Sequence, residues 1–121
     1  MTCPCGLPSS YDSCCGRLHS GTPAATAQAL MRARYSAFAV GDPSYLLRSW
    51  HSSTRPRLPD LDPEQRWERL DVLEVTRGGL LDQEGTVEFR AHYSLRGRAG
   101  AVHELSRFAR EGGAWVYVGP A

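Results

Sequence analysis

The apolar residues of this 121-residue chain change their spacing near Trp67. Before this point they recur every three or four residues, as expected for helices that bury one face. After it they alternate with polar residues, which is typical of strands in a sheet with one buried face. A run of helices followed by a run of antiparallel strands predicts an α+β fold, in which the helices pack on one face of the sheet.

Two helices are predicted between residues 22 and 50. Thr22 is a suitable N-cap for the first helix, and Pro23 fits the first helical position that follows it. Gly41 is suited to the end of this helix. Asp42 followed by Pro43 repeats this cap-then-proline pattern and predicts the start of the second helix. The positions assigned to one face of the first helix are Ala27, Leu30, Met31, Arg34, Tyr35 and Phe38.

The second half of the chain predicts an antiparallel meander. Its first strand is expected to contain a bulge, because the alternation of apolar and polar residues slips there. Turn-forming glycines separate the later strands and allow each to fold back on the one before. The expected strands cover residues 70–75, 87–95, 102–109 and 115–118.

Charge and hydropathy argue against several classes of protein. The chain has 14 basic residues, all Arg, and 13 acidic residues, which gives a net charge of +1. A general nucleic-acid binder or membrane-surface binder needs a clear basic excess, so neither class is favoured. No apolar run approaches the roughly 20 residues of a transmembrane helix, and no signal peptide pattern opens the chain. We therefore expect a soluble, cytoplasmic protein.

All four cysteines lie within the first 15 residues, in the pattern C-x-C-x8-C-C. The residues between the two pairs form turns readily, so Cys3 and Cys5 can meet Cys14 and Cys15. Four thiolates at this spacing predict a closed tetrahedral zinc site of the structural kind. Iron is the alternative metal because thiolates also bind it, whereas disulfides would be unusual in a reducing compartment.

Residues 3–16, Cys-Pro-Cys-Gly-Leu-Pro-Ser-Ser-Tyr-Asp-Ser-Cys-Cys-Gly, resemble the SEC-C motif, a metal-binding module also found at the C-terminus of the SecA translocation ATPase. Further segments are similar to the YchJ family, so that the resemblance covers nearly the whole chain. These segments are 29–38, 50–56, 103–108 and 115–119.

The resemblance implies two parts of the chain. Residues 1–20 would form a SEC-C zinc-binding module, and residues 22–121 a cone-shaped domain similar to nuclear transport factor 2 (NTF2-like). Because the first segment is short and polar, it is expected to add little to the main core. The family is itself uncharacterised, so the resemblance implies a fold and a metal site rather than an activity.

Cone-shaped domains of this kind enclose a pocket between the sheet and the first helices, which is the default place for a ligand. The candidate residues of this pocket are Tyr35, Trp50, His51, Glu104 and Arg34. We expect a buried ion pair between Glu104 and Arg34, because a buried carboxylate without a partner is costly. His103 cannot assist Glu104, since neighbours on a strand point to opposite faces.

The sequence contains no nucleophile motif and no glycine loop suited to phosphate. We therefore expect a non-enzymatic interaction or adaptor protein with a four-cysteine zinc site, although the sequence does not exclude catalysis. One alternative is a small-molecule-binding or hydrolytic domain that uses the pocket. Another is a metal-handling or redox role of the thiolates with iron.

The expected partners follow from the resemblance to the SecA tail. They are other proteins, of the class of secretion chaperones or ribosome-associated factors. A homodimer is a further expectation, because cone domains often pair through the outer face of the sheet. Arg90, His92 and Arg107 would lie near that interface.

Overall fold

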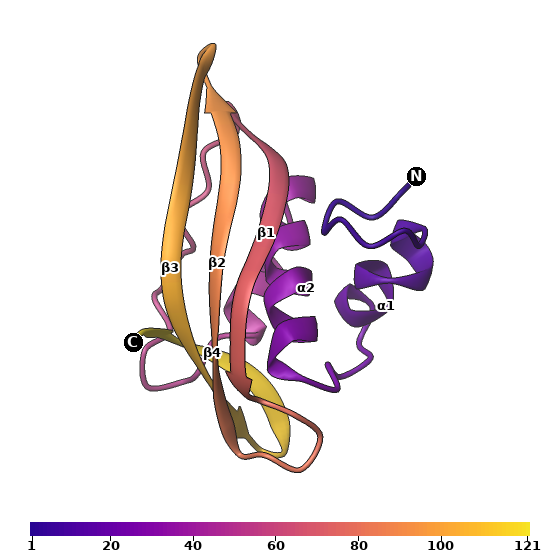
Figure 1. Ribbon diagram of the computed structural model, residues 1–121, viewed down its shortest axis with the longest axis vertical. Coiled ribbons are helices and arrows are strands. Elements are labelled where there is room, and N and C mark those ends of the chain that lie inside the picture. The colour runs from indigo at the N-terminus through magenta and orange to yellow at the C-terminus, as the bar shows by residue number, and fades with distance from the viewer.

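The computed structural model describes residues 1–121 and has an α+β architecture, as predicted (Figure 1). Four helical segments precede four strands. None of the helices is long and apolar enough to cross a membrane. The elements in chain order are the 3-10 turn η1 (Tyr11–Ser13), α1 (Cys15–His19), α2 (Ala27–Val40), α3 (Pro43–Arg48), β1 (Gln65–Arg77), β2 (Glu84–Leu95), β3 (Arg98–Glu111) and β4 (Ala114–Pro120).

The four strands form one antiparallel sheet in the order β1-β2-β3-β4, so that every strand pairs with its neighbours in sequence. Two of the turns are only two residues long. Arg96 and Gly97 have φ values of 51° and 80°, and Gly112 and Gly113 have φ values of 61° and 85°. Two successive positive φ values characterise the tight hairpin turns that match the twist of the strands.

The bulge predicted in the first strand is confirmed, and β1 contains two such irregularities. The pairing with β2 shifts between Trp67 and Arg69 and again between Val72 and Glu74. A bulge bends its strand and increases the local twist, and β1 and β2 curve beside α2 (Figure 1).

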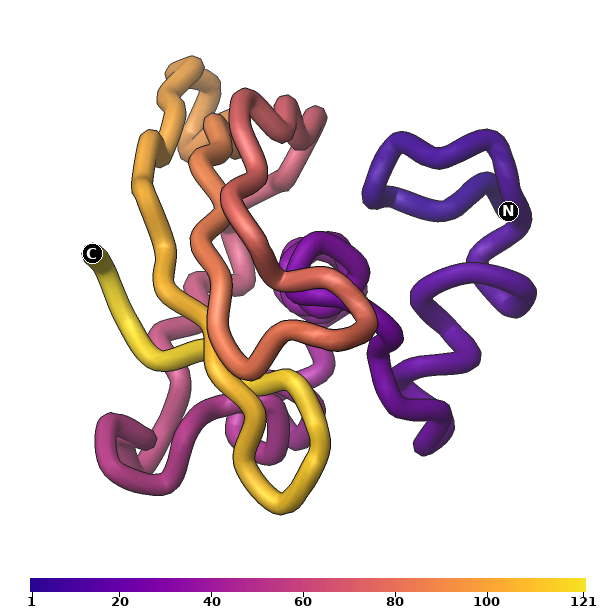
Figure 2. Tube along the Cα trace, turned by 60° about the horizontal axis from the view of Figure 1, so that its bottom comes forward, coloured from indigo at the N-terminus to yellow at the C-terminus, as the bar shows by residue number.

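Helix α2 lies between the sheet and the N-terminal segment in both views (Figures 1 and 2). The inner face of the sheet buries Val87, Phe89 and Ala91, and α2 contacts β1, β2 and β4. The alternation predicted for residues 87–95 therefore identified the buried face correctly. Arg90 and Arg107 are exposed on the opposite face of the sheet.

The first helix begins later than predicted. Thr26, rather than Thr22, is the N-cap of α2, and its Oγ1 accepts a hydrogen bond of 3.1 Å from the Ala29 N–H. The position is fixed from outside the helix, because the Ala27 N–H donates to the carbonyl oxygen of Gly78 at 2.9 Å. The predicted end of this helix is confirmed, since Gly41 is its C-cap in the left-handed conformation.

The predicted start of the second helix is confirmed as well. Asp42 is the N-cap of α3, and its Oδ1 accepts a hydrogen bond of 3.0 Å from the Tyr45 N–H. The helix then ends after six residues, at Arg48. Beyond it, the chain from residue 51 to residue 64 contains no helix or strand.

Replacing Thr26 with Ala should lower the free energy of unfolding by about 1 kcal/mol, the usual cost of a lost N-cap. Thr22→Ala is the control, because Thr22 is exposed and its side chain makes no hydrogen bond; its effect should stay within about 0.5 kcal/mol. Urea denaturation of both variants measures the difference. Equal losses in the two variants would contradict the position of the cap.

Candidate functional site

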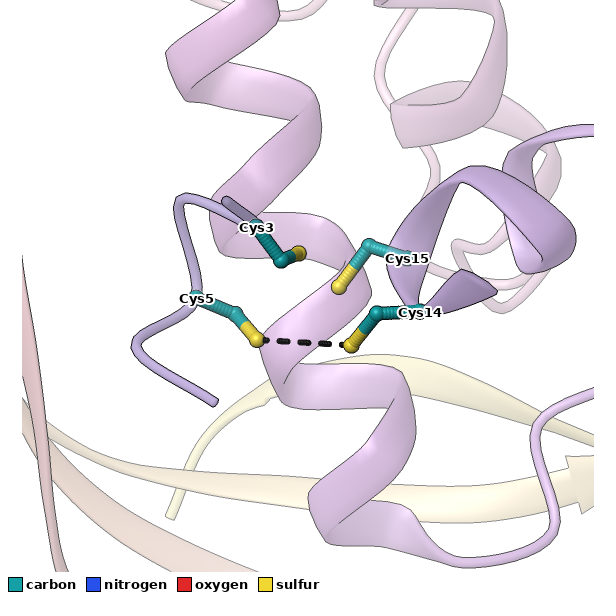
Figure 3. A group of neighbouring side chains, drawn as sticks. All are labelled: Cys3, Cys5, Cys14 and Cys15. Atoms are coloured by element: carbon teal, nitrogen blue, oxygen red, sulfur yellow. Dashed lines mark hydrogen bonds between the residues drawn. The ribbon is translucent and has the colours of Figure 1, made fainter. Parts of the chain in front are cut away.

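The sulfur atoms of the four cysteines converge on one point (Figure 3). All four lie within 4.8 Å of one another, and the Sγ atoms of Cys5 and Cys14 are 3.8 Å apart. A tetrahedral zinc ion with Zn–S distances of about 2.3 Å requires sulfur–sulfur distances of about 3.8 Å. The cluster therefore has the ligands and nearly the spacing to hold one metal ion, namely Cys3, Cys5, Cys14 and Cys15.

Backbone hydrogen bonds shape the segment that carries these cysteines, residues 2–16, which we call the knuckle. Thr2 pairs with Ser10 in an isolated antiparallel bridge, and the Cys3 N–H donates to the Ser9 carbonyl at 2.9 Å. Gly6 turns the chain between them with a φ of 95°. These contacts close a loop whose Cys3 and Cys5 side chains both point toward Cys14 and Cys15 (Figure 3).

Adjacent cysteines serve the same centre because the backbone changes direction between them. Cys14 precedes α1 with φ −119° and ψ −112°, whereas Cys15 is the first residue of that helix. Both side chains consequently turn toward Cys3 and Cys5 (Figure 3).

The thiols do not ionise independently of one another. A hydrogen bond from the Cys15 thiol lowers the pKa of Cys5, and the same interaction raises the pKa of Cys15. Burial raises the pKa of Cys14 to about 11. Among Cys5, Cys14 and Cys15, the pKa of the Cys5 thiol is thus the one that its neighbours lower. A divalent cation is the kind of group that would stabilise the others as thiolates.

His19 follows the cluster closely in sequence but does not belong to it. Its Nε2 donates to the carbonyl oxygen of Ala33 at 2.8 Å. Its Nδ1 lies 2.6 Å from the hydroxyl of Tyr11, which donates to it in the neutral tautomer. Both ring nitrogens are therefore engaged: Nε2 ties α1 to α2, and Nδ1 ties α1 to η1.

The cysteine cluster rests directly on α2. The Sγ of Cys3 lies 3.6 Å from the Ser36 Oγ, and Arg32 donates through Nη1 to the Cys5 carbonyl at 2.7 Å. The sequence suggested that this segment adds little to the core, but the packing differs. One continuous hydrophobic cluster contains Cys3, Cys5, Cys15 and Leu18 together with the residues under the sheet.

A cavity of about 360 Å³ is lined by other residues of α2 and by the inner face of the sheet. Met31, Arg34, Tyr35 and Phe38 line it from the helix. Its remaining lining residues are Trp50, Asp60, Gln65, Trp67, Phe89, Ala91, Val102, Glu104, Ser106 and Tyr117. Four of the five pocket residues named from the sequence are thus brought together, namely Tyr35, Trp50, Glu104 and Arg34.

The fifth residue, His51, does not line the cavity. Its Nε2 lies 3.7 Å from a carboxylate oxygen of Glu111, and its Nδ1 lies 2.8 Å from the Ser53 hydroxyl. The chain leaves α3 here, and the His51 N–H donates to the Tyr117 carbonyl at 2.8 Å. This backbone bond holds residue 51 beside β4, while the His51 side chain lies next to Glu111 at the end of β3.

The predicted ion pair between Arg34 and Glu104 is not formed, and this expectation is corrected. Arg34 donates through Nη1 to the Leu46 carbonyl and the Ser49 hydroxyl, both at 2.8 Å. Its guanidinium carbon lies 4.8 Å from the ring centre of Trp50 and 4.6 Å from that of Tyr117. Cation–π contacts and neutral oxygens thus surround the charge, with no carboxylate oxygen within 4.0 Å.

Glu104 instead has two hydroxyl partners. Its Oε2 accepts hydrogen bonds from the Ser106 hydroxyl and, at 2.8 Å, from the Tyr117 hydroxyl. Burial, followed by this hydrogen bond, raises the pKa of Tyr117, which therefore remains protonated and able to donate. Tyr117 was not named from the sequence as a pocket residue, because it lies in the last strand, far along the chain from most of the other candidates. The pairing that brings it to the cavity wall depends on the hairpin between β3 and β4.

Comparison with protein families identifies a match over most of the chain. The model of the YchJ middle NTF2-like domain matches residues 26–120. A UPF0225 protein from Streptomyces coelicolor is 57% identical over 116 residues, which cover 95% of this chain and 90% of the relative. A UPF0225 protein from Chromobacterium violaceum is 48% identical over 121 residues, which cover 96% and 89% of the two chains.

Two solved structures have a similar fold over the whole chain. A SEC-C motif containing protein from Rhodopseudomonas palustris has a TM-score of 0.85 at 33% identity, and the match covers 98% of that protein. A SEC-C motif containing protein from Psychrobacter arcticus has a TM-score of 0.81 at 29% identity, with 82% of that protein covered. The combination of the NTF2-like domain with these relatives shows that the chain belongs to the YchJ family of UPF0225 proteins.

Proposed function

We propose that this chain is a zinc-binding adaptor protein, in which a structural four-cysteine site fastens the knuckle onto α2. The convergence of four sulfur atoms within 4.8 Å carries the proposal. Four sulfur ligands complete a tetrahedral shell and leave no position open for water or substrate, which is the mark of structural zinc sites. The structural similarity to two SEC-C motif containing proteins supports a metal in this place.

The outer surface of the knuckle supports the adaptor role. Leu7 is 40% exposed, and Pro8 beside it is exposed as well. Apolar side chains displayed on a rigid loop are suited to contact with another protein. Secretion chaperones and ribosome-associated factors are the partner classes that the SEC-C resemblance favours.

The purified protein should contain one equivalent of zinc, measured by elemental analysis. Cys5→Ser should lose most of this metal because it removes one of the four sulfur ligands. Ser9→Ala is the matched control in the same loop, since its exposed side chain makes no hydrogen bond, and it should retain the zinc. Iron in place of zinc, with visible absorption, would instead support the redox alternative.

Removal of the metal by a chelator should lower the thermal stability of the whole domain. The metal-free thiols lie in the same hydrophobic cluster as α2, so loosening the knuckle uncovers one side of that helix. A loss of about 3 kcal/mol corresponds to a fall of roughly 10 °C in the melting temperature for a chain of this size. Calorimetry with and without added zinc measures the change. An unchanged melting temperature would show that the knuckle is thermodynamically separate.

Leu7→Ser should abolish capture of the partner while zinc content and melting temperature stay at the wild-type values. Leu58→Ser is the control, because Leu58 is 78% exposed but lies in the loop before β1. Affinity capture from cell extract, followed by mass spectrometry, compares the two variants with wild type. Recovery of the same proteins by all three chains would contradict the assignment of the knuckle as the interaction surface.

A further inference from the structure

The cavity beside α2 has the size and the walls of a small-ligand site. Its volume of about 360 Å³ exceeds the roughly 150 Å³ of an engineered cavity that binds benzene. Aromatic rings from five parts of the chain surround it, namely Tyr35 and Phe38 of α2, Trp50 after α3, Trp67 of β1, Phe89 of β2 and Tyr117 of β4. Walls of this kind accommodate a flat apolar body.

Arg34 lines this cavity without a direct ion-pair partner. Arg34 is only 5% exposed, yet no carboxylate lies within 4.0 Å of it. Its Nη1 is used by Leu46 and Ser49, whereas Nε and Nη2 have no acceptor in the protein. A buried cation without an anion in contact pays a desolvation cost that an anionic ligand would offset.

Two more polar groups of the cavity residues lack partners. The hydroxyl of Tyr35 and the indole Nε1 of Trp50 are buried without any hydrogen bond. The indole N–H can only donate, and the same holds for the guanidinium. The N–H groups of Arg34 at Nε and Nη2 are donors only, so a ligand that pairs with them must bring acceptor oxygens.

Glu104 sets the orientation of such a ligand. Its carboxylate is bonded to the hydroxyl of Tyr117, and the ring of the same Tyr117 is stacked on Arg34. The cavity thus has a positive end at the ring face of Tyr117 and a negative end at its hydroxyl. An acidic group is attracted to the first end and repelled by the second.

We propose that this cavity binds a small organic carboxylate with a flat apolar body, whose carboxylate pairs with Arg34 and whose ring packs among the aromatic walls. An Arg guanidinium offers the paired N–H geometry that a carboxylate accepts. This site is independent of the cysteine cluster, since none of the four cysteines lines the cavity.

The test uses the full-length, zinc-loaded protein and three probes of the same shape: phenylacetate, phenylacetamide and phenethylamine. Binding is followed by tryptophan fluorescence, because Trp50 and Trp67 line the cavity. Phenylacetate should bind at least tenfold more tightly than the neutral amide, and the amine should not compete with it. Equal affinity for the acid and the amide, or tighter binding of the amine, would overturn the proposal.

Two variants should shift the affinity in opposite directions. Arg34→Met should weaken phenylacetate binding at least tenfold and leave phenylacetamide unchanged, whereas Glu104→Gln should strengthen phenylacetate binding by removing the repulsive charge. Arg48→Met is the matched control, since Arg48 stacks on Tyr45 and does not line the cavity. The affinity of this variant for phenylacetate should equal that of wild type.

Circular dichroism first establishes that each variant is folded. If Arg34→Met does not fold, the decision rests on Glu104→Gln and on the acid-to-amide ratio of the wild type, neither of which needs that variant. Unchanged phenylacetate affinity in Arg34→Met or in Glu104→Gln would overturn the assignment of the carboxylate position.

Discussion

The burial of α2 on two opposite sides is the constraint on which the rest of the molecule depends. A helix that packs on a single sheet needs one apolar stripe, whereas a helix enclosed on both sides must suit two different neighbours. On the knuckle side α2 offers small groups, such as Ala33 and Ser36, both fully buried. On the sheet side it offers larger ones, including Tyr35 and Phe38. The small groups on one side allow the cysteines to approach the helix closely. The larger side chains on the other side line the open space under the sheet.

Features that depend on local sequence could be predicted before the structure was known. The alternation of residues 87–95, the Asp42 cap and the Gly41 stop each depend on neighbours within a few positions, and each is confirmed. The convergence of four cysteines is also local, because a short turn-rich loop is enough to bring the pairs together.

Features that depend on distant partners could not be predicted in the same way. The start of α2 is fixed by a hydrogen bond to Gly78, which lies in the turn after β1. The partner of Glu104 is Tyr117 rather than Arg34, because the register between β3 and β4 decides which side chain reaches the carboxylate. Charge complementarity alone suggested the wrong pair, since stacking on aromatic rings and two neutral acceptors already surround the guanidinium.

The placement of the cysteines and of Tyr117 has a consequence for the order in which the two sites arise during synthesis. All four cysteines lie within residues 3–15, so a growing chain carries the complete cluster of thiols long before any strand has been made. The cavity, in contrast, acquires its wall only when β4 pairs with β3 and delivers Tyr117. The four cysteines therefore leave the ribosome well before the cavity can form, because the cavity wall requires β4.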